Sequence, residues 1–307
     1  MLKSILIHPE ELSKKWIDRL ADGGVKILGL HPHGGGQATE SLNDLLSRLE
    51  DSEYREFIDY AESRGLEIEY EMHAARHLLP ASLFESHPEY FRMNAGGERT
   101  EKMNFCVSNP DALALVAKNA AALAKRLYKS RPVFYFWLDD AKNVHCKCEK
   151  CQKYSPSDQQ LIAVNAMITE IKKDIPEAKM AYLAYGDTLA VPSKIRPESG
   201  VFLEYAPIEK YKNGDESLIT AEREALLKQS EFFGFKDSKV LEYWLDNSLF
   251  SGWKKPPKEF TPDNAQIKKE VADYAALGFE AVATFGCFLG EDYEELYGEA
   301  DISGFTE

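Results

Sequence analysis

Apolar positions along the chain recur in two alternating patterns. Short runs rich in β-branched and aromatic residues are each followed by a longer stretch whose apolar residues repeat with a helical period. The runs that predict strands cover residues 4–7, 26–30, 66–72, 133–138, 179–185, 201–205, 239–245 and 280–285. Helical periodicity is clearest over residues 111–129, 158–174, 218–233 and 264–277. Alternation of this kind predicts parallel strands joined by helices.

The number of these units favours a closed barrel over an open sheet. Eight predicted strands in 307 residues match a (β/α)8 barrel, which typically needs about 250 residues. Asn109 and Pro110 are typical of a helix start, and Gly65 and Gly278 stand where helices end. We therefore predict an α/β fold of the (β/α)8 TIM-barrel class, with residues 1–307 forming a single domain.

One long irregular segment interrupts the alternation. Residues 77–105 show neither a strand nor a long helix pattern. Loops of this length in a compact domain usually serve a function. Because active sites in such barrels gather at the carboxyl ends of the strands, we expect this segment to cover the barrel mouth.

Composition and charge exclude several kinds of partner. The formal net charge is −14, and no basic stripe is present that would neutralise phosphates, so we expect no nucleic-acid partner. The sequence has no run of roughly 20 apolar residues and no signal peptide pattern. We therefore expect no membrane association and a cytoplasmic location. We expect no organic cofactor, and the oligomeric state stays open.

Acidic and aromatic residues gather where the predicted strands end. Glu71 and His73 share one face of the third strand, and Glu242, Trp244 and Asp246 share one face of the seventh. Because successive side chains alternate across a strand, we expect these polar sets to line the barrel interior. Further predicted site residues at strand ends are His31, His33, Trp137, Asp139, Asp140, Tyr185, Glu204 and Tyr205. Paired carboxylates beside flat aromatic rings favour carbohydrate as the substrate or ligand.

A cysteine cluster follows the fourth predicted strand. Cys146, Cys148 and Cys151 have the spacing Cys-x-Cys-x-x-Cys, which brings three thiolates within reach of one ion. Zinc in structural sites prefers four ligands of this kind. We expect Cys106 to be the fourth ligand, with His145 as the alternative. A structural zinc ion would then fasten the long segment to the loop after the fourth strand, although the spacing also fits three free thiols in a surface turn.

Several of these motifs occur together in a known family. The relevant segments are residues 70–73 (YEMH), 78–80 (LLP), 105–110 (FCVSNP), 137–140 (WLDD) and 146–151 (CKCEKC). They resemble a bacterial family of uncharacterised domains related to glycoside hydrolases. The resemblance covers residues 66–155 well and the rest at the level of the fold. It implies a barrel akin to those of hexosaminidases and α-glucuronidases.

The resemblance also implies roles for particular acids. Hexosaminidase-like barrels end the fourth strand with Asp then Glu, where the Glu protonates the leaving oxygen and the Asp orients the acetamido group. This chain has Asp139 and Asp140 at those positions, so the side chain at the acid's position is one methylene shorter. In α-glucuronidase-like barrels further carboxylates come from later strands, and Glu204 is the closest match.

Our leading hypothesis is a glycoside hydrolase that acts on an oligosaccharide or glycan fragment. Asp140 would be the general acid, with its pKa raised by neighbouring carboxylates. Glu204 or Asp246 would serve as base, nucleophile or stabiliser of the transition state. The residues expected to shape the sugar subsite are His73, Glu71, Tyr185 and Trp244.

Two other classes of protein stay open. The acids could bind sugar hydroxyls without hydrolysis, as in a non-catalytic carbohydrate-binding barrel, and Asp140 in place of Glu fits that alternative. A metal-dependent hydrolase or isomerase is the third class, because His31 and His33 form a His-x-His pair. A carboxylate-held metal would use Glu71, His73, Glu204 and Asp246.

Overall fold

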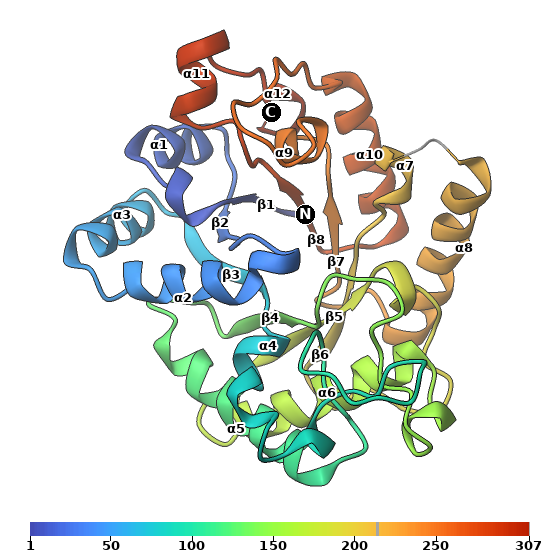
Figure 1. Ribbon diagram of the computed structural model, residues 1–307. Coiled ribbons are helices and arrows are strands. Elements are labelled where there is room, and N and C mark those ends of the chain that lie inside the picture. The colour runs from blue at the N-terminus through green and yellow to red at the C-terminus, as the bar shows by residue number, and fades with distance from the viewer. Residues whose placement is uncertain (213–214, 307) are drawn as a thin grey trace.

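A closed barrel of parallel strands lies at the centre of the structure (Figure 1). The computed structural model describes residues 1–212 and 215–306. Within this part of the chain eight strands pair in chain order, and β8 pairs back to β1. The strands are β1 (Leu2–Ile7), β2 (Ile27–Leu30), β3 (Glu67–His73), β4 (Val133–Trp137), β5 (Lys179–Ala184), β6 (Val201–Tyr205), β7 (Lys239–Glu242) and β8 (Ala281–Phe285). This topology confirms the predicted (β/α)8 fold class.

Helices surround the barrel (Figure 1). They are α1 (Lys14–Asp22), α2 (Ala38–Arg48), α3 (Ser52–Ser63), α4 (Ala75–Leu78), α5 (Pro110–Arg126), α6 (Pro156–Ile171), α7 (Glu209–Lys212), α8 (Glu216–Phe233), α9 (Asn247–Phe250), α10 (Asn264–Leu277), α11 (Glu291–Tyr297) and α12 (Ser303–Thr306). Short 3-10 helices cover Pro9–Glu11, Gly35–Gln37, Ala81–Leu83, Pro88–Tyr90, Cys151–Lys153 and Gly186–Thr188. Among the described residues no helix is both long enough and apolar enough to span a bilayer.

Local sequence explains where the long helices begin. The side chain of Asn109 accepts hydrogen bonds from two backbone amides in the first turn of α5. Ser155 caps α6 and Asp263 caps α10 in the same way. These oxygens satisfy amide groups that have no partner within the helix. Pro110 and Pro156 occupy first helical positions, where a missing N–H costs nothing.

Apolar side chains pack in two layers, one between barrel and helices and one inside the barrel. Ile5 and Met72 belong to the outer layer, whereas Leu6 and Phe202 belong to the inner layer. Gly29 on β2 makes room for the inner layer, because a Cβ at this position would lie 2.8 Å from Cγ of Leu6. The strand period of two thus places neighbouring residues in different layers.

The long segment between α4 and α5 lies beside the loop that follows β4 (Figure 1). It is folded back on itself through an antiparallel bridge between Phe91 and Phe105. The backbone amide of Lys147, in the β4–α6 loop, donates a hydrogen bond to the carbonyl of Met93 at 2.8 Å. Two loops that are distant in sequence are therefore joined at one end of the barrel.

Candidate active site at the carboxyl ends of the strands

A cavity of about 670 Å³ opens at the carboxyl ends of the strands. This volume lies within the range of roughly 300–1,000 Å³ typical of small-molecule sites. The predicted site residues that line it are His31, His33, His73, Trp137, Asp139, Asp140, Tyr185 and Asp246. The structure thus brings together side chains from the ends of β2, β3, β4, β5 and β7, which is where barrel enzymes carry their active sites.

Two carboxylates from different strands face this cavity. Asp140 follows β4 and is exposed, whereas Asp246 follows β7 and is only 7% exposed. Burial raises the pKa of Tyr243, and the charges of Asp140 and Asp246 raise it further. Both acids therefore lie within electrostatic range of the same ring.

Asp246 caps a helix, and its pKa is raised above the ordinary value. Its Oδ1 accepts hydrogen bonds from the Ser248 hydroxyl at 2.5 Å and from the Leu249 amide at 3.1 Å, which caps α9. Burial raises the pKa of Asp246 to about 6, while these two hydrogen bonds act in the opposite direction. A carboxyl group with a pKa near the working pH can act as a proton donor.

Asp139 is held by α4 and by the long segment. Its Oδ1 accepts from Nε of Arg76 at 2.9 Å, and its Oδ2 accepts from the backbone amide of Asn104 at 2.5 Å. In return, the backbone amide of Asp139 donates to Oδ1 of Asn104 at 2.8 Å. Both carboxylate oxygens of Asp139, which the sequence predicted as a site residue, are therefore already engaged by the protein.

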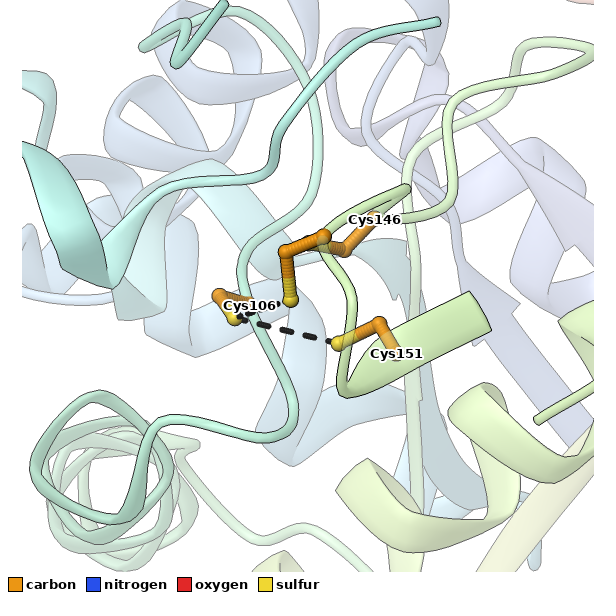
Figure 2. A group of neighbouring side chains, drawn as sticks. Cys106, Cys146 and Cys151 are labelled. Atoms are coloured by element: carbon orange, nitrogen blue, oxygen red, sulfur yellow. Dashed lines mark hydrogen bonds between the residues drawn. The ribbon is translucent and has the colours of Figure 1, made fainter. Parts of the chain in front are cut away.

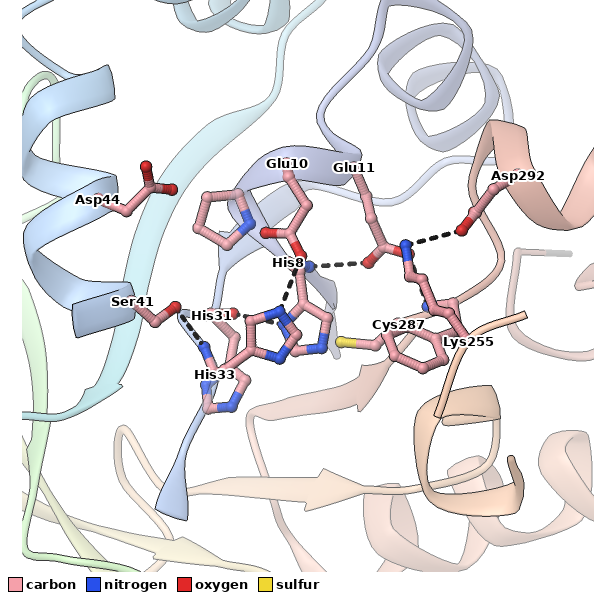
Figure 3. Close-up of polar contacts among 12 residues, drawn as sticks. His8, Glu10, Glu11, His31, His33, Ser41, Asp44, Lys255, Cys287 and Asp292 are labelled. Atoms are coloured by element: carbon pink, nitrogen blue, oxygen red, sulfur yellow. Dashed lines mark hydrogen bonds and ion pairs between the residues drawn. The ribbon is translucent and has the colours of Figure 1, made fainter. Parts of the chain in front are cut away.

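Histidines from the first three strand ends form one wall of the cavity, and Figure 3 shows His8, His31 and His33 of this group. Nδ1 of His8 lies 2.8 Å from the His31 carbonyl, Nδ1 of His31 lies 2.8 Å from the Glu71 carbonyl, and Nδ1 of His73 lies 2.6 Å from the Leu138 carbonyl. A carbonyl only accepts, so each Nδ1 carries the hydrogen and each neutral ring offers Nε2 as an acceptor. Burial lowers the pKa of His8 to about 4 and that of His31 well below its ordinary value.

Glu71 and Glu204 lie deeper, in the interior of the barrel. Both side chains are fully buried, and Nζ of Lys239 lies 2.5 Å from Glu71 and 3.2 Å from Glu204. The indole N–H of Trp137 donates to Glu204 at 2.8 Å, so this cavity-lining ring separates Glu204 from the substrate space. The structure therefore does not bring Glu204 together with Asp140 and Asp246 in the cavity. The four residues expected to hold a metal are divided between the barrel interior, with Glu71 and Glu204, and the cavity, with His73 and Asp246.

The side chains of β7 face the opposite sides of the strand from those expected. Lys239 faces the barrel interior and Tyr243 faces the cavity. Because successive side chains alternate across a strand, Glu242 and Trp244 face the helices. Glu242 accepts hydrogen bonds from Lys210 at 2.6 Å and from the Tyr274 hydroxyl at 2.6 Å. Neither Glu242 nor Trp244 lines this cavity.

Tyr205 also lies outside the cavity. Its side chain is 1% exposed and packs in the layer between barrel and helices. The residue that continues β6 into the cavity wall is Ala206. The sequence pattern placed Tyr205 at a strand end but could not show which side of the strand it occupies.

Several residues that line the cavity were not predicted for the sugar site from the sequence. Among those with polar groups that could contact a sugar are His8, Tyr243 and His145. His8 directly follows the first predicted strand, which is a signal of the same kind as His31 after the second. His145 was considered only as a zinc ligand. Among the described residues neither of its ring nitrogens has a hydrogen-bond partner, although its side chain is buried.

The four predicted zinc ligands converge, and Figure 2 shows three of them, Cys106, Cys146 and Cys151. The sulfurs of Cys106, Cys146, Cys148 and Cys151 all lie within 4.8 Å of one another. Sγ of Cys106 lies 3.7 Å from that of Cys148 and 3.8 Å from that of Cys151. A tetrahedron with zinc–sulfur bonds of about 2.3 Å has edges of about 3.8 Å, so these distances fit one zinc ion. His145 is not a member of this group, so the sulfur of Cys106, and not the ring of His145, lies with the other three sulfurs.

A second group of side chains that could hold a metal ion lies at the cavity wall (Figure 3). Ligand atoms of His8, Glu11 and Cys287 lie within 4.8 Å of one another, and all three residues are buried. The carboxylate of Glu11 already accepts from the backbone amides of Phe288 at 2.6 Å and His8 at 3.0 Å. These contacts hold the loops after β1 and β8 together.

The chain belongs to the class of (β/α)8 barrels, and its fold is similar to that of known glycoside hydrolases. A β-galactosidase from Marinomonas ef1 aligns with a TM-score of 0.55 at 11% identity, over 92% of this chain and 54% of that one. Endo-glycoceramidase II from Rhodococcus sp. aligns with a TM-score of 0.56 at 12% identity, over 100% of this chain and 77% of that one. A β-galactosidase from Rahnella sp. R3 gives 0.56 at 14% identity, over 93% and 50%. This chain thus spans about half the length of the two β-galactosidases.

The family itself is defined by sequence. The chain belongs to the family described as a domain of unknown function, DUF4838, whose profile matches residues 48–228. That range contains the cysteine group and the end of β4. No curated protein matches the sequence.

Proposed function

We propose that this chain is a glycoside hydrolase that uses Asp246 and Asp140 as its pair of carboxylates. One observation carries the proposal: acids from the ends of β7 and β4 line the same cavity, together with Trp137 and Tyr185. Glycoside hydrolysis needs one carboxyl group on each side of the scissile bond. The flat faces of the aromatic rings suit sugar rings.

The environments of the two acids assign different roles to them. Asp246, with a pKa raised to about 6 by burial, holds the proton and donates it to the glycosidic oxygen as the C–O bond breaks. Asp140, which is exposed to the cavity, serves as the second carboxylate, either as nucleophile or as base for the attacking water. This assignment exchanges the roles that the sequence indicated, because Asp246 is the buried member of the pair.

The remaining polar groups supply partners for sugar hydroxyls. Nδ1 of His31 and Nδ1 of His73 each donate to a carbonyl, which leaves Nε2 of each ring for a sugar hydroxyl. His145 adds two buried ring nitrogens that make no hydrogen bond among the described residues, with Nδ1 3.9 Å from the Asp187 carboxylate. Unsatisfied buried polar groups are costly. A ligand rich in hydroxyl groups would satisfy them.

A panel of oligosaccharides tests the proposal and separates hydrolysis from binding alone. We would incubate the chain with cello-, xylo-, manno-, galacto- and N-acetylglucosamine oligosaccharides, measure binding by calorimetry and assay new reducing ends. The proposal expects at least one series to bind and to be cleaved. Binding without new reducing ends would favour the non-catalytic carbohydrate-binding barrel.

We also propose that the cysteine group binds one structural zinc ion. The sulfur–sulfur distances support a tetrahedral site, and the backbone amide of Met93 donates to Cys146 at 3.3 Å. Such N–H contacts stabilise thiolate charge around a metal. Four thiolates leave no open position, so the ion would join the long segment to the β4–α6 loop without taking part in the reaction.

A metal-dependent hydrolase is favoured by one observation, the convergence of His8, Glu11 and Cys287. Three protein ligands with an open position are typical of catalytic zinc. Metal analysis of the purified chain distinguishes the two functions. One zinc per chain that is lost in Cys106→Ser supports a structural site alone, whereas a second ion that is retained in Cys106→Ser and lost in His8→Ala would support the metal-dependent reaction.

A further inference from the structure

A second cavity adjoins the first. It measures about 750 Å³ and lies between the loop after β7 and helix α10. Six of its sixteen lining residues are aromatic, with Trp244, Phe250 and Phe260 among them. Asp246 and Trp253 line both cavities. The proposed proton donor therefore stands where the two cavities meet.

Trp253 is held in an uncommon position at this junction. Its side chain is 65% exposed, which is rare for so large an apolar residue. Its backbone φ is 55°, in the left-handed region that bulky residues avoid. The backbone amide of Trp253 donates to the Ser248 carbonyl at 2.7 Å, which fixes the turn. Strain of this kind persists where the surroundings enforce it, commonly at ligand sites.

The chemistry of the second cavity fits a neutral sugar ring. Nζ of Lys210 lies 2.6 Å from Glu242 and 2.8 Å from Glu270, so its charge is already balanced. The indole N–H of Trp244 donates to Glu270 at 2.5 Å. Flat aromatic faces with a few polar groups at the edges suit a ring that is apolar on its faces and polar at its rim.

We propose that the substrate is an oligosaccharide that occupies both cavities, with Trp253 stacking on the ring in the second cavity and the scissile bond beside Asp246. This inference rests on the proposed glycosidase function and extends it to the substrate class. A chain of linked sugars is required, because a single ring fills only one of the two spaces. Trp253 and the other aromatic rings of the second cavity then contribute to binding on the far side of the cleaved bond.

Affinity as a function of ligand length tests the inference. The measurements use the Asp140→Asn variant, which prevents turnover. We would measure dissociation constants by calorimetry, and by ligand-observed NMR for weak binders. The ligands are mono- to pentasaccharides of the cello, xylo, manno, galacto and N-acetylglucosamine series. We expect affinity to rise at least tenfold between one ring and the length that fills both cavities. Trp253→Ala would reduce this gain to less than twofold, whereas Trp253→Phe would retain most of it. Leu227→Ala, exposed on α8 and outside both cavities, serves as the control.

The outcomes separate this inference from the function on which it rests. Failure of every series to bind the wild-type chain overturns both. Binding of single sugars without a gain on lengthening, or a gain that Trp253→Ala leaves intact in a chain with wild-type thermal stability, overturns the inference and leaves the hydrolase proposal standing. Loss of the gain in Trp253→Ala with retention in Trp253→Phe supports it.

Discussion

Replacing Asp246 by Asn tests the central electrostatic feature of the cavity. Both cap hydrogen bonds, from Ser248 and from the Leu249 amide, end on the same oxygen, Oδ1. The amide oxygen of Asn can accept both of them, so the cap of α9 is retained. What the substitution removes is the titrating proton.

The size of the effect follows from the pKa. Folding raises the pKa of Asp246 from its ordinary value of 3.8 to about 6, so the folded chain binds this proton more tightly than the unfolded chain. The stabilising contribution is fully present below pH 3.8 and is lost as the pH rises through 6. At 1.36 kcal/mol per pKa unit, the total is about 3 kcal/mol. About 2 kcal/mol of this falls between pH 4.5 and pH 7.5.

Urea unfolding at several pH values measures this contribution. The free energy of unfolding of the wild-type chain should fall relative to that of Asp246→Asn by about 2 kcal/mol between pH 4.5 and 7.5. Titration of the other groups is common to both proteins and cancels in the difference. Asp273→Asn, which alters an acid on α10 that lies outside both cavities and whose side chain is 59% exposed, serves as the matched control.

The same variant tests the proton donor. Turnover on a cleaved oligosaccharide should fall about 10²- to 10⁴-fold, as is usual when a general acid is removed. Wild-type activity should decline as the pH rises through 6, where Asp246 loses its proton. A stability difference that does not change with pH would refute the raised pKa, and unchanged turnover would refute the catalytic role.

Three further substitutions probe the parts that support the site. Cys106→Ser should reduce bound zinc from one equivalent to almost none by elemental analysis, and full retention of zinc would contradict the proposed ligand set. Lys239→Met leaves the buried carboxylates of Glu71 and Glu204 without their cation and should destabilise the chain by about 3–5 kcal/mol in urea unfolding; a loss under 1 kcal/mol would show that the lysine does not balance them. Gly29→Ala places a methyl group 2.8 Å from Cγ of Leu6 and should cost about 1–3 kcal/mol, whereas unchanged thermal stability would contradict the tight inner layer.

The fold was predictable from the sequence because its signals are local. Apolar periodicity and capping residues identified all eight strands, with most boundaries within two residues of those observed. The exception is β7, expected to reach residue 245 but ending at Glu242. Its apolar and aromatic run continues past the point where pairing with β8 stops. Pairing depends on the partner strand, which the run itself does not encode.

The candidate site was predictable only in part, because side-chain direction in the barrel depends on distant residues. Polar residues of β3 do face inward, where Glu71 meets Lys239 on β7 at 2.5 Å. The same reasoning failed for Glu242, because β7 turns Lys239 inward to balance acids from other strands. Glu204 was expected in the cavity, yet the indole of Trp137 covers it. These are contacts between strands, and strand periodicity does not reveal them.

The central claim, that Asp140 takes part in cleaving a glycosidic bond, is tested most directly by measuring affinity and product release together. On one oligosaccharide bound by the wild-type chain, Asp140→Asn should bind within about threefold of wild-type affinity while releasing reducing ends at least about 100-fold more slowly. Wild-type rates of release from Asp140→Asn, or a wild-type chain that binds the sugar and releases nothing, would contradict the account.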